Sequence, residues 1–64
     1  MKVTINKKEE QLREGTTIEE ILKERKNHRP AVWVNGNQLL KVEYPTYVVN
    51  EGDVIKILKI MAGG

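Results

Sequence analysis

The chain of 64 residues contains no cysteine, no serine and no phenylalanine. Without cysteine, neither disulfides nor thiolate zinc sites can stabilise the fold, so packing alone must hold it together. The absence of serine and cysteine also removes the commonest side-chain nucleophiles. A domain of this size buries only about 60% of the surface that its unfolded chain exposes, which leaves no room for a deep cleft between two lobes. The composition therefore predicts one domain over residues 1–64 that is not an enzyme.

Long apolar runs are also missing from the sequence. No run approaches the roughly 18 residues that a membrane span requires, and residues 1–6 lack the apolar segment of a secretory signal. We therefore expect a cytoplasmic protein with no membrane partner. Eleven Lys and Arg against nine Asp and Glu leave a net charge of +2, an excess too small to favour nucleic acid as a partner.

Few residues suggest catalysis, phosphate binding or metal binding. The single histidine, His28, lies in a basic stretch over residues 23–29. Compensation of charge at a helix end explains this stretch, although a nucleic-acid patch is an alternative. The carboxylate pairs at residues 9–10 and 19–20 show no relation to a pocket, and the second pair fits a helix start. The glycines within the chain stand singly in turns and form no phosphate loop. We predict no catalytic residue and no metal site.

The first half of the chain predicts a strand pair followed by one helix. Val3 and Ile5 alternate with polar residues, as in a half-buried strand. A polar turn at residues 6–9 precedes a weaker returning strand. Thr17 and Glu20 then have the spacing of a capping box, in which each side chain accepts a hydrogen bond from the other residue's backbone. We expect a helix of about three turns that ends before Pro30, because the residue preceding a proline avoids the α region.

The second half predicts strands. Residues 31–34 form a short apolar run, and Asn35-Gly36 after it is a strong hairpin signal, with residues 37–40 returning. Residues 41–45 suggest an irregular link, and residues 46–49 a short strand or an extended segment. A turn at 50–53 leads to the longest strand candidate, residues 54–60. We predict an α+β fold in which one helix packs across one face of a mixed sheet of four to five strands.

Alternation along these strands separates two faces of the sheet. One face, together with the helix, is expected to form the core: Val3, Ile5, Ile18, Ile21, Leu22, Val32, Val34, Ile55 and Ile57. The opposite face is expected to carry Trp33, Leu58 and Ile60 uncovered, as a surface for a partner. The alternative is a register slipped by one residue, which would place Trp33 in the core.

The sequence ends in Gly63-Gly64 a few residues after the last predicted strand. Glycine has no side chain, so such a tail can thread a channel too narrow for other residues. A main-chain carboxylate is a poor electrophile until it becomes an acyl phosphate or adenylate. We predict that residues 61–64 form a flexible tail whose last carboxylate another enzyme activates; a frayed end without function is the alternative.

The whole chain resembles the ubiquitin-like β-grasp sulfur carriers, and most of all the thiamine-biosynthesis carriers, ThiS. The resemblance depends on the segments EGTTIEEIL (residues 14–22), VWVNG (32–36), EGDVIKI (51–57) and AGG (62–64). The related small subunit of molybdopterin synthase, MoaD, also ends in Gly-Gly but is usually longer. A binding module like the TGS domain, which shares the Gly-Thr-Thr helix start, is an alternative from a different class.

The resemblance implies a two-stage activation of the C-terminus. An E1-like adenylating enzyme (ThiF- or MoeB-like) would use ATP to adenylate Gly64, with Ala62, Gly63 and Gly64 in its channel. A sulfur donor would then convert the adenylate to a thiocarboxylate, which delivers sulfur to thiazole synthase or to another acceptor enzyme. The carrier itself would bind no cofactor, because the partner enzyme uses the ATP.

Overall fold

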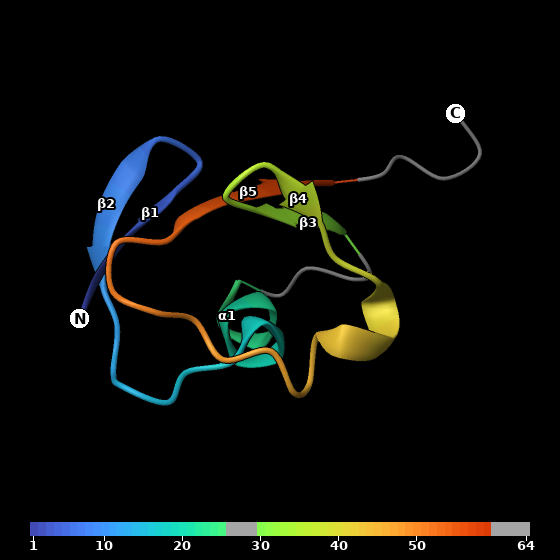
Figure 1. The fold of residues 1–64 in the computed structure, drawn as a ribbon, viewed down its shortest axis with the longest axis horizontal. Helices are drawn as coiled ribbons and strands as arrows, with labels where there is room; N and C mark the ends of the chain where they lie inside the picture. The colour runs from blue at the N-terminus through green and yellow to red at the C-terminus, as the bar shows by residue number, and fades with distance from the viewer. Residues whose placement is uncertain (26–29, 60–64) are drawn as a thin grey trace.

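The computed structural model describes residues 1–25 and 30–59. Five strands form one sheet in the order β2-β1-β5-β3-β4, in which β1 and β5 are parallel and the other neighbours are antiparallel. The helix α1 lies against one face of this sheet (Figure 1). The predicted α+β plan is therefore confirmed. In chain order, the elements are β1 (Lys2–Ile5), β2 (Lys8–Gln11), α1 (Ile18–Glu24), β3 (Ala31–Val34), β4 (Asn37–Gln38), the 3-10 helix η1 (Lys41–Glu43) and β5 (Val54–Leu58).

The predicted capping box begins α1. The Thr17 hydroxyl accepts a hydrogen bond from the Glu20 N–H at 3.3 Å, and the Glu20 carboxylate accepts one from the Thr17 N–H at 3.0 Å. These hydrogen bonds from the Thr17 backbone and side chain lower the pKa of the Glu20 carboxyl. The helix ends at Glu24, however, after about two turns. The prediction of three turns was too long, because Arg25 already leaves the regular helix geometry, with ψ at −2°, and caps the helix.

The core lies between α1 and the sheet. Each of the nine residues predicted for it is buried. Pairing of β3 with β5 places Val32 opposite Ile57 and Trp33 opposite Lys56, so the valines face the helix and Trp33 faces away. The predicted alternation is therefore correct and the slipped register is wrong. The core also contains three residues that the alternation did not identify: Leu39, Tyr44 and Val49.

The connection between β4 and β5 packs on the same side as the helix (Figure 1). Tyr44 anchors it: its buried hydroxyl donates to the Pro30 carbonyl at 2.8 Å, and its own carbonyl accepts from the Glu19 N–H at 3.0 Å. Burial raises the pKa of the Tyr44 phenol. The link predicted as irregular thus contains the 3-10 helix η1. Residues 46–49 make no strand, only an isolated bridge between Val48 and Thr17.

The hairpin turn after β3 is fastened to the turn before β5. Asn35 lies in the left-handed region at φ 52°, followed by Gly36 at φ 85°. Its side chain donates to the buried Asp53 carboxylate at 3.0 Å and accepts from the Val54 N–H at 2.9 Å. The second carboxylate oxygen of Asp53 accepts from the Asn50 N–H at 2.8 Å. Two segments 18 residues apart in sequence therefore form one hydrogen-bonded unit at the end of the sheet.

The turn between β1 and β2 has the same shape without a glycine. Asn6 and Lys7 connect the paired residues Ile5 and Lys8, with φ values of 49° and 70°. The left-handed region suits Asn and Gly but costs other residues about 1–2 kcal/mol. We therefore expect Lys7→Gly to raise the free energy of unfolding by about 1 kcal/mol, measured by urea denaturation. Gly36→Ala in the other hairpin is the control and should lower it; a loss of stability in Lys7→Gly would contradict the strain.

Candidate functional site

The predicted site of sulfur attachment lies at the C-terminus. Gly64 and the residues predicted to thread an enzyme channel with it, Ala62 and Gly63, lie outside the described residues. Ile60, predicted for the partner surface, also lies outside them. Their roles therefore stay predictions. The structure does describe β5, the strand that precedes this tail in the sequence, and the sheet surface around it.

The face of the sheet away from α1 presents a mixed apolar and basic surface. Trp33 of β3 is half-buried there, while Val54 and Leu58 of β5 are 54% and 44% exposed. Lys56 lies between them in the strand, and its ammonium is 5.9 Å from the centre of the Trp33 ring. At this distance the cation is attracted to the ring, and its aliphatic stem can shield part of the indole. We call Trp33, Val54, Lys56 and Leu58 the outward sheet face.

The outward sheet face contains two of the three residues predicted for a partner surface, Trp33 and Leu58. Neither helix of the described residues covers it, since α1 and η1 lie on the other side of the sheet (Figure 1). Val54 and Lys56 were not identified from the sequence, although the alternation that selects Leu58 also selects them. An exposed apolar patch around an aromatic residue is typical of a protein-binding surface.

Asn6 joins β1 to the end of β5. Its side-chain oxygen accepts from the Ile57 N–H at 2.8 Å, and its side-chain nitrogen donates to the Ile57 carbonyl at 3.2 Å. Its backbone N–H donates to the Ile55 carbonyl at 3.0 Å. The sequence predicted only a polar turn at this position. Nothing local distinguishes an asparagine that merely forms a turn from one whose side chain reaches another strand.

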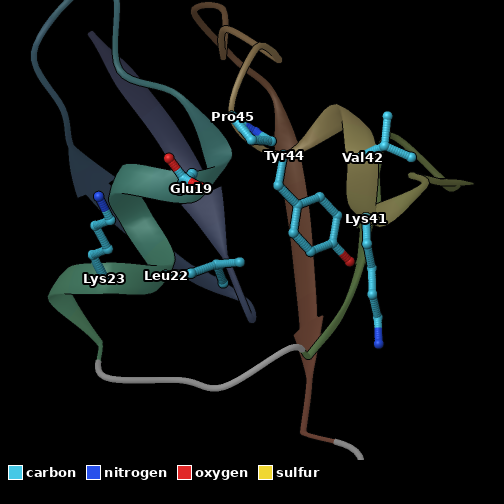
Figure 2. A pocket seen from close by; sticks show the side chains of 7 residues that line it. All are labelled: Glu19, Leu22, Lys23, Lys41, Val42, Tyr44 and Pro45. Carbon is cyan, nitrogen blue, oxygen red and sulfur yellow. The ribbon is translucent and has the colours of Figure 1, made fainter.

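A second surface feature lies between α1 and η1, on the helix side of the molecule. Figure 2 shows Tyr44 between the two helices, with Glu19 and Lys23 on α1 and Lys41 on η1. The hollow has a volume of about 600 Å³. Its lining contains one carboxylate and no hydroxyl nucleophile other than the buried Tyr44, whose hydroxyl is engaged with Pro30. The seven residues that line the hollow are Glu19, Leu22, Lys23, Lys41, Val42, Tyr44 and Pro45.

Of the candidate carboxylates, Glu9, Glu10 and Glu20 have side-chain partners, while Glu19 lines the hollow, contrary to the sequence-based expectation. Glu20 caps α1, and Glu10 forms an ion pair with Arg25. His28 and the rest of the second part of the basic stretch, residues 26–29, lie outside the described residues. Within residues 1–25 and 30–59, no three His, Asp or Glu side chains group as metal ligands would. Neither helix in this part of the chain has the length and apolarity to cross a membrane.

Comparison with known proteins identifies the fold and then the family. A crystal structure of the thiamine biosynthesis protein (ThiS) from Geobacter metallireducens aligns with a TM-score of 0.82 and 28% identity over 100% of both chains. A solution NMR structure of a thiamine biosynthesis protein from the same organism aligns with a TM-score of 0.79 and 28% identity, over 100% of this chain and 88% of that one. No curated protein sequence matches. The mixed sheet crossed by one helix is thus a β-grasp fold. The ThiS family model matches residues 2–64, and the chain belongs to the ThiS family.

Proposed function

We propose that this protein is a sulfur carrier of thiamine biosynthesis whose C-terminal carboxylate, on Gly64, carries the sulfur. The observation that supports this most is the family match, which runs through both terminal glycines. Full-length alignment with a protein named for thiamine biosynthesis at 28% identity adds to it. The described residues supply a scaffold and an uncovered sheet face, as expected of a substrate that other enzymes hold.

The proposed chemistry takes place entirely at the terminal carboxylate. A carboxylate oxygen of Gly64 attacks the α-phosphorus of ATP on an E1-like adenylating enzyme, and pyrophosphate leaves. A persulfide sulfur then attacks the acyl carbon and displaces AMP. A thiol attacks the donor's sulfur in the resulting S–S bond, forms a new disulfide with the donor and releases the thiocarboxylate. Thiazole synthase is the proposed acceptor of this sulfur. The chain binds no cofactor in this scheme and is a substrate in each step rather than a catalyst.

The test combines the purified chain with its cognate adenylating enzyme, ATP and a persulfide donor. Intact-mass spectrometry should show exchange of one oxygen for sulfur, and fragmentation should locate it on the last residue. Omission of ATP is the control and should leave the mass unchanged. Absence of the exchange with an adenylating enzyme proven active on another carrier would contradict the proposal. Assembly with the large subunit of molybdopterin synthase, in place of sulfur transfer to thiazole synthase, would favour the MoaD-like alternative. Binding to a partner without any mass change would favour the TGS-like one.

The outward sheet face is the proposed docking surface for the adenylating enzyme. Placing a charge in it by Leu58→Glu should raise the KM for the carrier tenfold or more, because a desolvated apolar contact contributes roughly 1–2 kcal/mol or more to binding. The same charge at Val42, 79% exposed on the helix side of the molecule, is the matched control. Val42→Glu should leave KM unchanged.

The two variants should be compared by steady-state adenylation kinetics at fixed saturating ATP. Urea denaturation of both should remain cooperative, since both positions are exposed and neither contributes to the core cluster. Equal effects of the two substitutions on KM would contradict a docking role for the outward sheet face.

A further inference from the structure

We propose that Asn6 is a positioning residue that sets the direction in which the chain leaves β5 towards the reacting carboxylate. This inference rests on the proposed function, because it concerns the delivery of Gly64 to the adenylating enzyme. It is carried by the hydrogen bonds that join Asn6 to β5. The sequence between Ile57 and the terminal carboxylate contains only residues 58–64.

The parallel pairing of β1 with β5 is short. It joins Thr4 to Val54 and Ile5 to Ile55, and β1 then turns away at Asn6 and Lys7 towards β2. A backbone strand on this side would have continued to pair with Ile57. The Asn6 carboxamide takes its place, since it accepts from the Ile57 N–H and donates to the Ile57 carbonyl, the two groups that a neighbouring strand would have bonded.

A residue at position 6 must meet two requirements, one for its backbone and one for its side chain, and asparagine meets both. The backbone has φ 49°, which glycine and asparagine tolerate and most other residues do not. The side chain must offer one acceptor to the Ile57 N–H and one donor to the Ile57 carbonyl. We call the two hydrogen bonds from the Asn6 side chain to Ile57 the clamp. Glycine would make the turn without the clamp. Aspartate would keep the acceptor but would place a second oxygen, which cannot donate, opposite the Ile57 carbonyl. The two partners also fix the orientation of the amide, because the acceptor must face the N–H.

Among the hydrogen bonds of residues 1–25 and 30–59, those of Asn6 lie farthest along β5 on its β1 side. On the other side, β3 pairs with β5 as far as Leu58, through Ala31. The end of β5 is therefore held on both sides, by a strand on one and by a single side chain on the other. Drawn out in an enzyme channel, the seven residues after Ile57 reach at most about 25 Å. If the hold at Ile57 is lost, the end of β5 can move relative to the bound scaffold, so that fewer bound carriers present the carboxylate at the ATP. An error of 1 Å in a reacting group can cost roughly 100-fold in rate.

Variants of the outward sheet face and variants of Asn6 should then affect different kinetic constants. The outward sheet face supplies affinity, so its variants change KM. Asn6 acts on the fraction of bound carriers whose carboxylate reaches the ATP, so its loss lowers kcat and leaves KM nearly unchanged. We expect Asn6→Gly to lower kcat for adenylation about tenfold, well short of the roughly 100-fold cost of an uncorrected misplacement. Asn6→Asp should lower it similarly, and serves if the glycine variant is too unstable.

The experiment measures ATP–pyrophosphate exchange for the wild type and the Asn6 variants with the cognate adenylating enzyme. Two control variants distinguish the loss of positioning from a general loss of protein stability. Ile18→Val weakens the core, and Lys7→Gly alters the same turn but leaves the Asn6 side chain in place. Both should keep the wild-type kcat. An Asn6→Gly variant that is folded, has lost protection of the Ile57 amide against hydrogen exchange and keeps the wild-type kcat would overturn the inference.

A second measurement does not depend on adenylation. NMR relaxation of the isolated chain should show lower backbone order at Ile57 and Lys59 in Asn6→Gly than in the wild type, with Ile55 unchanged. Unchanged order at Ile57 and Lys59 would overturn the inference whatever the activity. A wild type that supports no exchange at all, with order that does change in Asn6→Gly, would contradict the proposed function and leave the positioning of the chain by Asn6 supported.

Discussion

Deletion of Gly64 is expected to abolish formation of the acyl-adenylate and to leave the thermal stability of the protein unchanged. The proposed reaction takes place on the last carboxylate, and a chain that is one residue shorter places that carboxylate about 3.5 Å short of its position in an enzyme channel. Gly63→Val should also block activation, because a β-branched residue restricts the backbone and widens the tail. The measurement is ATP–pyrophosphate exchange beside a thermal melt of each variant.

An N-terminal extension is the matched control for a C-terminal one. The Met1 nitrogen donates to the Leu12 carbonyl at 2.7 Å, and an added residue keeps an N–H at this place. The N-terminal extension should therefore retain the native rate of adenylation, whereas a C-terminal tag should remove it. Adenylation of a C-terminally tagged and uncleaved protein at the native rate would refute the carrier proposal.

Features set by neighbours in sequence were predictable. The capping box of Thr17 and Glu20 needs only a spacing of three residues, and the structure contains both of its hydrogen bonds. The alternation of Val32, Trp33 and Val34 determined which face of β3 is buried. The same local rules predicted the Asn35-Gly36 hairpin, since its backbone requires positive φ at both residues.

Features that depend on contacts distant in sequence were not predictable. Tyr44 belongs to the core because its hydroxyl reaches the Pro30 carbonyl, and nothing in the link around it is periodic. Asn6 appeared as one more turn residue, although its side chain binds a peptide group 51 positions later. The length of α1 was overestimated because Pro30 sets only the last residue that the helix could reach, whereas Arg25 already caps it.

The segments on which the family resemblance depends, as far as the structure describes them, make contacts that stabilise the fold. The helix-start segment supplies the capping box, and the Val-Asn-Gly and Glu-Gly-Asp segments meet where Asn35 binds Asp53 and Val54. These contacts join the start of β5 to the β3–β4 turn, while Asn6 holds its other end. The motifs thus stabilise the strand from which the proposed reactive tail follows, and in the proposed function the chemistry itself depends on the terminal glycines alone.

Truncation of a core isoleucine should destabilise this small domain severely. Ile21 of α1 and Ile57 of β5 are 3% and 6% exposed, and replacing such a residue by alanine costs about 2–5 kcal/mol through lost burial and the cavity left behind. A chain of 64 residues has a total stability of about 3–10 kcal/mol. Either variant should therefore lose a large share of its free energy of unfolding, measured by urea denaturation. Leu58→Ala, next to Ile57 but on the outward sheet face, is the matched control and should lose less than about 1 kcal/mol, as a partly exposed side chain does. A loss below about 0.5 kcal/mol at both isoleucines, far under the usual cost of a core truncation, would contradict the assignment of the core to the helix side of the sheet.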